Sequence, residues 1–218
     1  MKVQIISLFP EMFDGVLNAS MLWKAQDKKI VEFQHIHLRD FGVGPRHQVD
    51  DTPYGGGDGM LLMPGPLLAA IEQAKANDPE ALVILPTPRG ERYKQSDAKT
   101  LAANANGLIL VCARYEGYDE RITQWIDRQY CIGSYVVTGG ELPAMVIIDS
   151  VVRLLPGVLG GETSAEIESF QADDVTIEFP QYTRPENFHG LKVPEILLSG
   201  HHAEIAKWRD SQAKNVYQ

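Results

Sequence analysis

Residues 114–121, Arg-Tyr-Glu-Gly-Tyr-Asp-Glu-Arg, place five charged side chains within eight positions, directly after an apolar run. Carboxylates can accept protons, and guanidinium groups can stabilise negative charge that builds during a reaction. The alternative interpretation is a solvated turn followed by the start of a helix, where the helix dipole favours acidic side chains. The position of these residues after a buried run favours a functional site, but their types alone do not indicate which reaction it would catalyse.

Arg153 is a second candidate, because it interrupts an otherwise apolar stretch. Asp149 precedes it by four residues, so both side chains would share one face of a helix. One interpretation is a buried structural ion pair. The other is that Asp149 holds Arg153 with its guanidinium directed into a site, and the residues alone do not choose between the two.

Two short apolar runs must position these groups. Residues 107–112 and 130–137 are rich in β-branched and aromatic residues, the pattern of buried parallel strands. Each run leads into a polar or Gly-rich loop, residues 113–121 and 138–143. Ligands of open α/β sheets bind beyond the carboxyl ends of the strands, so these loops are where a site is expected.

The rest of the first part alternates between strand and helix patterns. Strands are expected at residues 3–8, 30–38 and 81–85, and helices at residues 10–28, 66–77, 95–104 and 142–155. This alternation predicts an α/β fold, a parallel sheet with helices on both faces. A long connection, residues 39–63, holds the Gly-rich run 54–59 and is expected to be functional.

Composition changes after Pro156, where the chain becomes rich in Gly, Ser and Glu. We therefore expect a first domain over residues 1–157, an interdomain linker over residues 158–174, and a small, mostly helical C-terminal domain over residues 175–218. The last domain is expected to contain a helix from about His201 towards Lys214.

Composition and short motifs also limit the partners, cofactors and location that can be expected for the chain. The formal net charge of −9 disfavours nucleic acid as a partner, so RNA binding would rest on local groups, the best being Arg89, Arg92, Lys94 and Lys99. The phosphate-binding motif G-x-x-x-x-G-K-[ST] is absent, and no His or Cys spacing predicts a metal site. With no signal peptide, no membrane span and two cysteines expected to be reduced, a cytoplasmic protein without a membrane partner is predicted.

Long motifs then identify a family. They are ISLFPEMF at 6–13, RHQVDDTPYGGGDGM at 46–60, ARYEGYDERI at 113–122, IGSYVVTGGELPA at 132–144, DSVVRLLPGVLG at 149–160, FPQYTRPENFHG at 179–190 and VPEILLSGHHAEI at 193–205. In these the chain resembles the bacterial tRNA (guanine-N1)-methyltransferases, of the SPOUT class. The resemblance implies a trefoil knot at the C-terminal end of the first domain, which periodicity does not show.

The resemblance implies methyl transfer from S-adenosylmethionine to N1 of the guanosine just 3′ of the anticodon, position 37 of tRNA. Residues expected to bind the methyl donor are Leu85, Pro86, Pro88, Ala113, Tyr115, Glu116, Gly117, Ile132, Gly133, Tyr135, Val137, Gly139, Gly140 and Pro143. Residues expected to bind tRNA are Arg46, His47, Asp50, Gly57, Gly59, Glu178 and Arg184.

Two residues take catalytic roles by resemblance. Guanine N1 carries a proton at neutral pH, so a base must remove it while a cation stabilises the charge that builds on O6. The matching residues are Glu168 as the base and Arg153 as the cation. The resemblance also implies a homodimer with the site shared between subunits, and Mg2+ as a further cofactor.

The chain departs from the family pattern at several positions. Glu168 stands where the family has Asp, Glu178 replaces a second linker acid, and Ala113 and Ser134 stand where Gly and an acid are expected. The family's tail usually continues into basic helices, whereas this sequence ends at Gln218, so a truncated C-terminal domain is an open alternative. An alternative function is therefore a catalytically weakened homologue that binds S-adenosylmethionine or RNA without efficient turnover.

Overall fold

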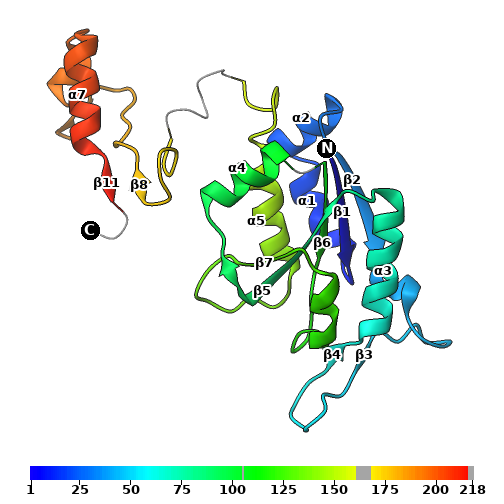
Figure 1. Cartoon of the computed structure of the whole chain (residues 1–218). Helices are drawn as coiled ribbons and strands as arrows, with labels where there is room; N and C mark the ends of the chain where they lie inside the picture. The colour runs from blue at the N-terminus through cyan, green and yellow to red at the C-terminus, as the bar shows by residue number, and fades with distance from the viewer. Residues whose placement is uncertain (105, 161–167, 216–218) are drawn as a thin grey trace. The chain divides into compact units, whose positions relative to one another are not determined.

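The structure is a computed structural model that describes residues 1–104, 106–160 and 168–215 (Figure 1). The chain divides into two compact units, Met1–Gly160 and Gly161–Gln218, called unit 1 and unit 2 below. The finer division at 157 and 174 stays a prediction. Val158, the first residue of the predicted linker, is fully buried in the core of unit 1.

Unit 1 is built on a five-stranded sheet in which every pairing is parallel. The strand order is β2-β1-β6-β5-β7, which confirms the predicted α/β fold with a parallel sheet. The strands are β1 (Lys2–Ser7), β2 (Glu32–His37), β5 (Leu82–Arg92), β6 (Gly107–Val111) and β7 (Arg128–Cys131).

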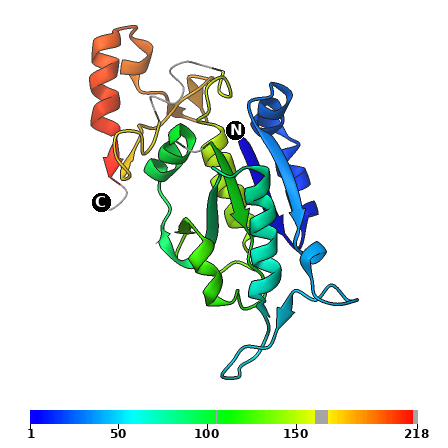
Figure 2. The ribbon, with the colours of Figure 1, turned by 45° about the vertical axis from the view of Figure 1, so that its right-hand side comes forward.

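Helices cover both faces of this sheet, as predicted, and each face has its own core. Helix α3 packs on one face, and α2, α4 and α5 pack on the other (Figures 1 and 2). The helical segments are η1 (Pro10–Phe13), α1 (Asp14–Leu17), α2 (Ser20–Asp27), η2 (Leu38–Phe41), α3 (Pro64–Asn77), α4 (Gln95–Asn104), η3 (Glu120–Trp125) and α5 (Glu141–Val152).

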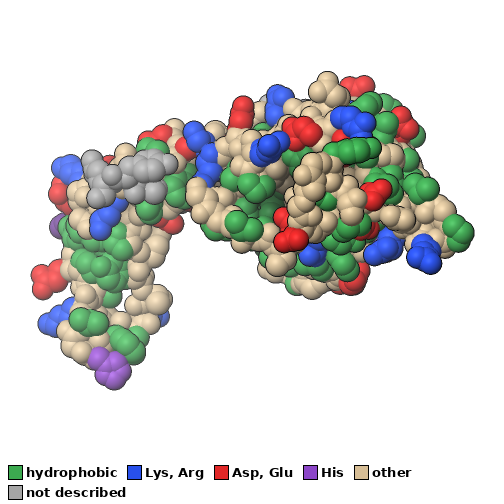
Figure 3. Space-filling model, turned by 90° about the horizontal axis from the view of Figure 1, so that it is seen from below, with side chains coloured by type: hydrophobic (Ala, Val, Ile, Leu, Met, Phe, Trp, Pro, Cys, Tyr) green, Lys and Arg blue, Asp and Glu red, His purple; other side chains and the backbone are tan. Residues whose placement is uncertain are grey.

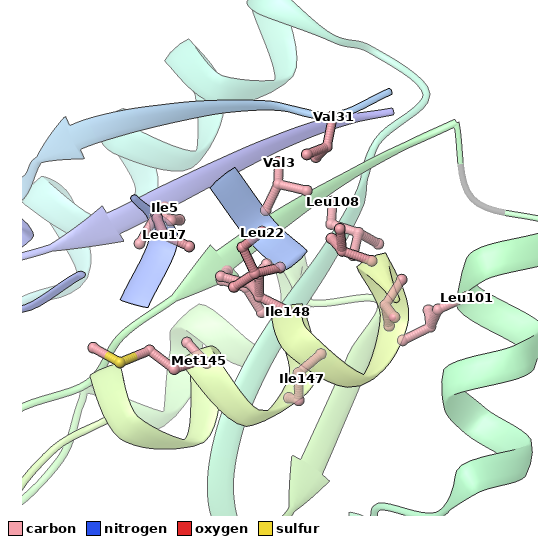
Figure 4. Close-up of a cluster of buried hydrophobic side chains, with 14 of the residues drawn as sticks. Val3, Ile5, Leu17, Leu22, Val31, Leu101, Leu108, Met145, Ile147 and Ile148 are labelled. Atoms are coloured by element: carbon pink, nitrogen blue, oxygen red, sulfur yellow. The ribbon is translucent and has the colours of Figure 1, made fainter. Parts of the chain in front are cut away.

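Strand alternation decides which core each apolar side chain joins. In β6, Leu108 and Leu110 join the core shared with α5, whereas Ile109 and Val111 join the core under α3. Figure 4 shows the first of these cores, with Val3 and Leu108 of the strands facing Ile148 and its neighbours on α5. Both faces of β6 are therefore buried, which explains its continuous apolar run.

Several predicted elements have different bounds, and β5 runs to Arg92, well beyond the strand predicted over residues 81–85. The predicted strand 130–137 was wrong beyond Cys131, because Ile132–Gly140 runs as a loop and Val136 is 92% exposed. The predicted helix 10–28 is broken into η1, α1 and α2, with Ser20 in the left-handed region at φ 50°. Helix α5 ends at Val152, so Arg153 is its C-cap.

Two short antiparallel strands, β3 (Asp50–Asp51) and β4 (Leu61–Leu62), close the long connection after η2. Figures 1 and 2 both show this segment reaching away from the sheet of unit 1. Its tip carries glycines with positive φ, which no residue with a side chain adopts as readily. The connection therefore extends away from the sheet as a projection that is closed by the pairing of β3 with β4.

Unit 2 is small and has little regular structure, so the prediction that it is mostly helical was wrong. Helix α7 (His202–Gln212) packs against two aromatic side chains. The ring centroids of Trp208 and Tyr182 are 6.4 Å apart, and Arg209 Cζ lies 4.7 Å from the ring centroid of Phe179. The remaining elements are β8 (Thr176–Ile177), β9 (Asn187–Phe188), β10 (Leu191–Lys192), α6 (Glu195–Leu198) and β11 (Lys214–Asn215). β8 pairs with β11, and β9 with β10, all antiparallel.

Ile109→Ala should lower the free energy of unfolding of unit 1 by about 2–5 kcal/mol, because it opens a cavity in the core between β6 and α3. Val43→Ala is the control, since Val43 is 62% exposed and its loss should change stability by about 0.5 kcal/mol or less. Urea unfolding followed by circular dichroism measures both. Equal losses in the two variants would contradict the described core.

Candidate active site

A cavity of about 400 Å³ lies at the ends of β6 and β7, beside the irregular part of β5 that follows Pro86. Its walls come from three stretches. Residues 86–89 belong to β5, residues 113–120 follow β6, and residues 130–143 run from the end of β7 through the loop beyond it to the start of α5. Parallel pairing places the three carboxyl ends at one edge of the sheet, the usual location of sites in such folds. The volume lies within the range of small-molecule sites.

The cavity gathers nearly all the residues expected to bind the methyl donor. The ones that line it are Pro86, Pro88, Ala113, Tyr115, Glu116, Gly117, Ile132, Gly133, Tyr135, Val137, Gly139, Gly140 and Pro143. Leu85 does not line it, because strand alternation turns its fully buried side chain into the core under α3.

Other lining residues were not expected from the resemblance. They are Thr87, Arg89, Arg114, Tyr118, Glu120, Tyr130, Cys131, Val136 and Thr138. Arg114 and Glu120 belong to the charged run that drew attention first, so their position after β6 was the available signal. Tyr118 donates a hydrogen bond to the hydroxyl of Thr87 at 3.2 Å, which no spacing rule could have suggested.

Glycines permit the close packing of the last lining loop. A Cβ on Gly140 would lie 2.7 Å from the Ala113 nitrogen and from the Cys112 Cα, and the Gly140 amide donates to the Ala113 carbonyl at 2.7 Å. A Cβ on Gly133 would meet the ring of Tyr135 at 2.0 Å. The loop after β7 therefore folds back tightly across the end of β6.

The loop after β6 is fixed by backbone contacts on its other side. Tyr115 has φ 59° and Gly117 has φ 125°, and the Gly117 amide donates to the Arg114 carbonyl at 3.0 Å. The Glu116 amide donates to the Met60 carbonyl, and the Leu62 amide to the Gly117 carbonyl, both at 3.0 Å. The β3–β4 projection is thus anchored to the cavity wall.

Residues expected to bind tRNA divide between the two units. Arg46 and His47 lie on an exposed turn, Asp50 begins β3, and Gly57 and Gly59 are exposed in the projection. A Cβ on Gly59 would lie 2.5 Å from the side chain of Glu116, so the projection touches the cavity rim. In unit 2, the Glu178 amide donates to Ser169 Oγ at 3.2 Å, and Arg184 is exposed.

The two residues expected to be catalytic belong to different units. Arg153 is half-buried at the end of α5, where its amide donates to the carbonyl of Asp149 at 3.2 Å. Glu168 is half-buried in unit 2, beside a turn in which the Phe170 amide donates to the Thr176 carbonyl at 2.6 Å. That both act in one site stays a prediction.

A carboxylate with no exposed surface lies behind the cavity. Glu141, the first residue of α5, accepts from Ser7 Oγ at 2.7 Å and pairs with Arg114 Nε at 2.9 Å.

Burial, together with the nearby charge of Glu141, raises the pKa of the Cys112 thiol well above its usual value. Cys112 is therefore protonated and unreactive at neutral pH, consistent with its predicted structural role.

The outer rim of the cavity carries exposed charge. Arg89 donates to Glu120 at 2.8 Å, with both side chains more than half exposed, so this pair contributes little to stability. On the face seen in Figure 3, Lys and Arg side chains are interspersed with Asp and Glu over unit 1. Of the expected basic group, Arg89 and Arg92 lie in β5, Lys94 directly precedes α4, and Lys99 lies in α4.

Within the described residues, no group of three or more His, Cys, Asp or Glu side chains is placed to hold a metal ion. In the same residues, no helix combines the length and the apolar character that crossing a bilayer requires.

Comparison with known proteins decides the family. The chain matches the model of the family described as tRNA (Guanine-1)-methyltransferase TrmD over residues 1–217. The chain belongs to this family. It is 52% identical over 214 residues to the tRNA (guanine-N(1)-)-methyltransferase of Geobacillus kaustophilus, covering 98% of this chain and 86% of that protein.

Other members of the tRNA (guanine-N1)-methyltransferase family give the same result. The protein of that name from Anaeromyxobacter sp. is 49% identical over 216 residues, covering 99% of this chain and 87% of that one. A crystal structure of tRNA (m1G37) methyltransferase from Aquifex aeolicus superposes with a TM-score of 0.78 at 35% identity, covering 95% of this chain and 87% of that chain. Family membership thus extends over both units.

Gly140→Ala should lower the free energy of unfolding by about 1–3 kcal/mol, because the added methyl group overlaps the backbone of Cys112 and Ala113. Gly15→Ala is the matched control. Gly15 lies in α1 with nothing within 4 Å of an added Cβ, so alanine should raise stability by about 0.5–1 kcal/mol. Thermal unfolding measures both, and a Gly140→Ala variant as stable as the parent would contradict the close approach.

Proposed function

We propose that this chain transfers a methyl group from S-adenosylmethionine to N1 of the guanosine just 3′ of the anticodon, position 37 of tRNA. The observation that carries the proposal is the full-length identity of about half to tRNA (guanine-N1)-methyltransferases. The cavity supports it, because the residues that the resemblance assigns to the donor come from three separate stretches and yet line one space.

The cavity residues fit such a donor. Pro86, Ile132, Val137 and Pro143 offer apolar surface for an adenine ring. Gly133, Gly139 and Gly140 also line the cavity, and without side chains their backbone groups can approach ribose and amine groups closely. S-adenosylmethionine, when bound, supplies an electrophilic methyl group.

The protein's own residues have two tasks in this reaction. Glu168 takes the proton from guanine N1 as the new bond forms, and Arg153 stabilises the negative charge that builds on O6. Glu in place of the family's Asp adds one methylene and one rotatable bond, so holding the carboxylate in place costs more side-chain entropy. Glu168 is thus the base in this proposal, with lower efficiency than the shorter side chain.

The proposal includes a homodimer that shares its site between subunits. What supports it is an exposed apolar surface on unit 1, where η1 packs against α5. Phe9, Met12 and Val16 are 36–40% exposed, and Leu142 and Val146 on α5 are each 47% exposed. Apolar side chains grouped in this way on neighbouring elements mark a surface that another protein covers.

Further features implied by the resemblance complete the proposal. The trefoil knot is supported by the path of the chain after β7, where Gly140 bonds to Ala113 beyond β6 before α5 joins the core. A cytoplasmic location is supported by the two free cysteines, Cys112 and Cys131. Mg2+ dependence rests on the resemblance alone, and no step above uses the ion.

The reaction is tested with methyl-labelled S-adenosylmethionine and two unmodified tRNA transcripts that differ only in guanosine or adenosine at the target position. Label should enter the guanosine transcript alone, and nuclease digestion should recover it as 1-methylguanosine. Donor binding without transfer of label would contradict the proposal and favour the weakened homologue instead.

Arg153→Ala should reduce kcat by on the order of a hundredfold while changing donor affinity little, because the lost charge acts mainly in the transition state. Single-turnover methylation and titration calorimetry measure the two quantities. An unchanged kcat would show that Arg153 has only a structural role at the end of α5.

Glu168→Gln should nearly abolish methyl transfer, because the amide keeps the size of the side chain and loses its basicity. Glu168→Asp is the matched control and should remain active. Mixing the Arg153→Ala and Glu168→Gln proteins should restore activity, since a mixed dimer with shared sites contains one intact Arg153–Glu168 pair.

Full turnover by Glu168→Gln would refute its role as the base and make Glu178 the next candidate, together with Glu166, which lies outside the described residues. Mixed proteins that stay inactive, although subunits exchange, would contradict a shared site.

A further inference from the structure

Glu141 is an ionisable side chain that the proposed chemistry does not use. It is fully buried at the start of α5, where one oxygen accepts a hydrogen bond and the other makes an ion-pair contact without a hydrogen bond. Ser7 Oγ donates to Oε1 at 2.7 Å, and Arg114 Nε lies 2.9 Å from Oε2. A buried carboxylate is costly unless it is paired, so this position is built around the ion pair.

Arg114 extends the contact from Glu141 to the loop after β7. Its side chain is 15% exposed, and Nη1 donates to the carbonyl of Thr138 at 3.3 Å. On the other side, Nη2 lies 2.8 Å from Met12 Sδ, and the guanidinium stacks 4.6 Å from the ring centroid of Phe9. The planar group therefore has a fixed orientation and cannot rotate away from Thr138 without losing all of these contacts.

The pair lies directly between two of the three walls of the cavity. A Cβ on Gly139 would stand 2.5 Å from Arg114 Nε and 2.6 Å from Glu141 Oε2, so the loop after β7 rests on the pair. Arg114 itself belongs to the loop after β6, whose next residues line the cavity. The pair of Arg114 and Glu141 thus helps to set the separation of these two walls, together with the bond from the Gly140 amide to the Ala113 carbonyl.

We propose that Glu141 is a positioning residue for the methyl donor, acting through Arg114 to hold the loops 113–117 and 132–140 in the shape that binds it. The inference rests on the proposed function. Glu141 has no exposed surface with which to touch a ligand, so its effect on binding passes through Arg114 and the Thr138 carbonyl. Neutralising either partner leaves the other as an unpaired buried charge, and the loop after β7 loses its support before the sheet does.

The test uses the whole chain with Glu141→Gln, Arg114→Gln and the double variant. Binding of S-adenosylhomocysteine, measured by titration calorimetry, should weaken by about tenfold or more in each single variant. The double variant should be no weaker than the worse single variant, because both substitutions remove the same contact. In turnover assays the KM for S-adenosylmethionine should rise by a larger factor than kcat falls in each single variant, because the substitutions act on donor binding.

A second readout needs no ligand. In the donor-free protein, Glu141→Gln should speed hydrogen exchange of the amides in residues 133–140, and that of Gly140 above all, because its bond to Ala113 depends on the loop staying in place. Arg114→Lys guards against misfolding. Lysine keeps a cation beside Glu141 but lacks the second nitrogen that reaches Thr138. The variant should therefore fold, and its affinity for the donor should be lower than that of the parent protein.

Gln4→Met is the matched control. Gln4 is also fully buried in β1, but it donates to the Ala74 carbonyl at 2.8 Å on the face covered by α3. Its loss should lower thermal stability and leave donor affinity and exchange of residues 133–140 unchanged. This separates positioning from a general loss of stability.

Unchanged donor affinity in a folded Glu141→Gln or Arg114→Lys protein would overturn the proposal, as would additive losses in the double variant. Donor binding that falls equally in Gln4→Met would assign Glu141 a purely structural role. A parent protein that binds no S-adenosylhomocysteine would instead refute the proposed function.

Discussion

Parallel pairing of β6, β5 and β7 is the constraint on which the site depends. It brings the ends of three strands, separated in sequence by other elements, to one edge of the sheet. The stretches that leave these ends have little regular structure, so tight contacts must hold their shape. Glycines without room for a Cβ supply some of these contacts, and the buried pair of Glu141 and Arg114 supplies another. Sheet, loops and ion pair thus form one support for the cavity.

The sequence predicted much of this arrangement, and for identifiable reasons. Apolar runs with strand and helix periods located the sheet and the helices on both faces, and the charged run after β6 located the cavity wall. The strand predicted over 130–137 failed because Val136 and Val137 have strand-like side chains but lie in a loop that lines the cavity. Gly140 packs there against the backbone of Cys112 and Ala113, a contact that periodicity cannot reveal.

Long-range polar contacts also could not be predicted from the sequence. Ser7 and Glu141 lie 134 residues apart, and no spacing rule joins them. Leu85 was expected at the site from resemblance, yet strand alternation directs it into the core. The catalytic roles proposed for Arg153 and Glu168 rest on the family motif, because the residue types around them suit structural interpretations equally well.

The central claim is that the cavity at the ends of β5, β6 and β7 binds the methyl donor. A crystal structure of the full chain with S-adenosylhomocysteine tests it most directly. The account predicts density for the ligand between residues 86–88, 115–117 and 132–143, with Glu141 and Arg114 paired behind it and Leu85 out of contact. Ligand bound at any other place, with this cavity closed or filled by side chains, would contradict the account.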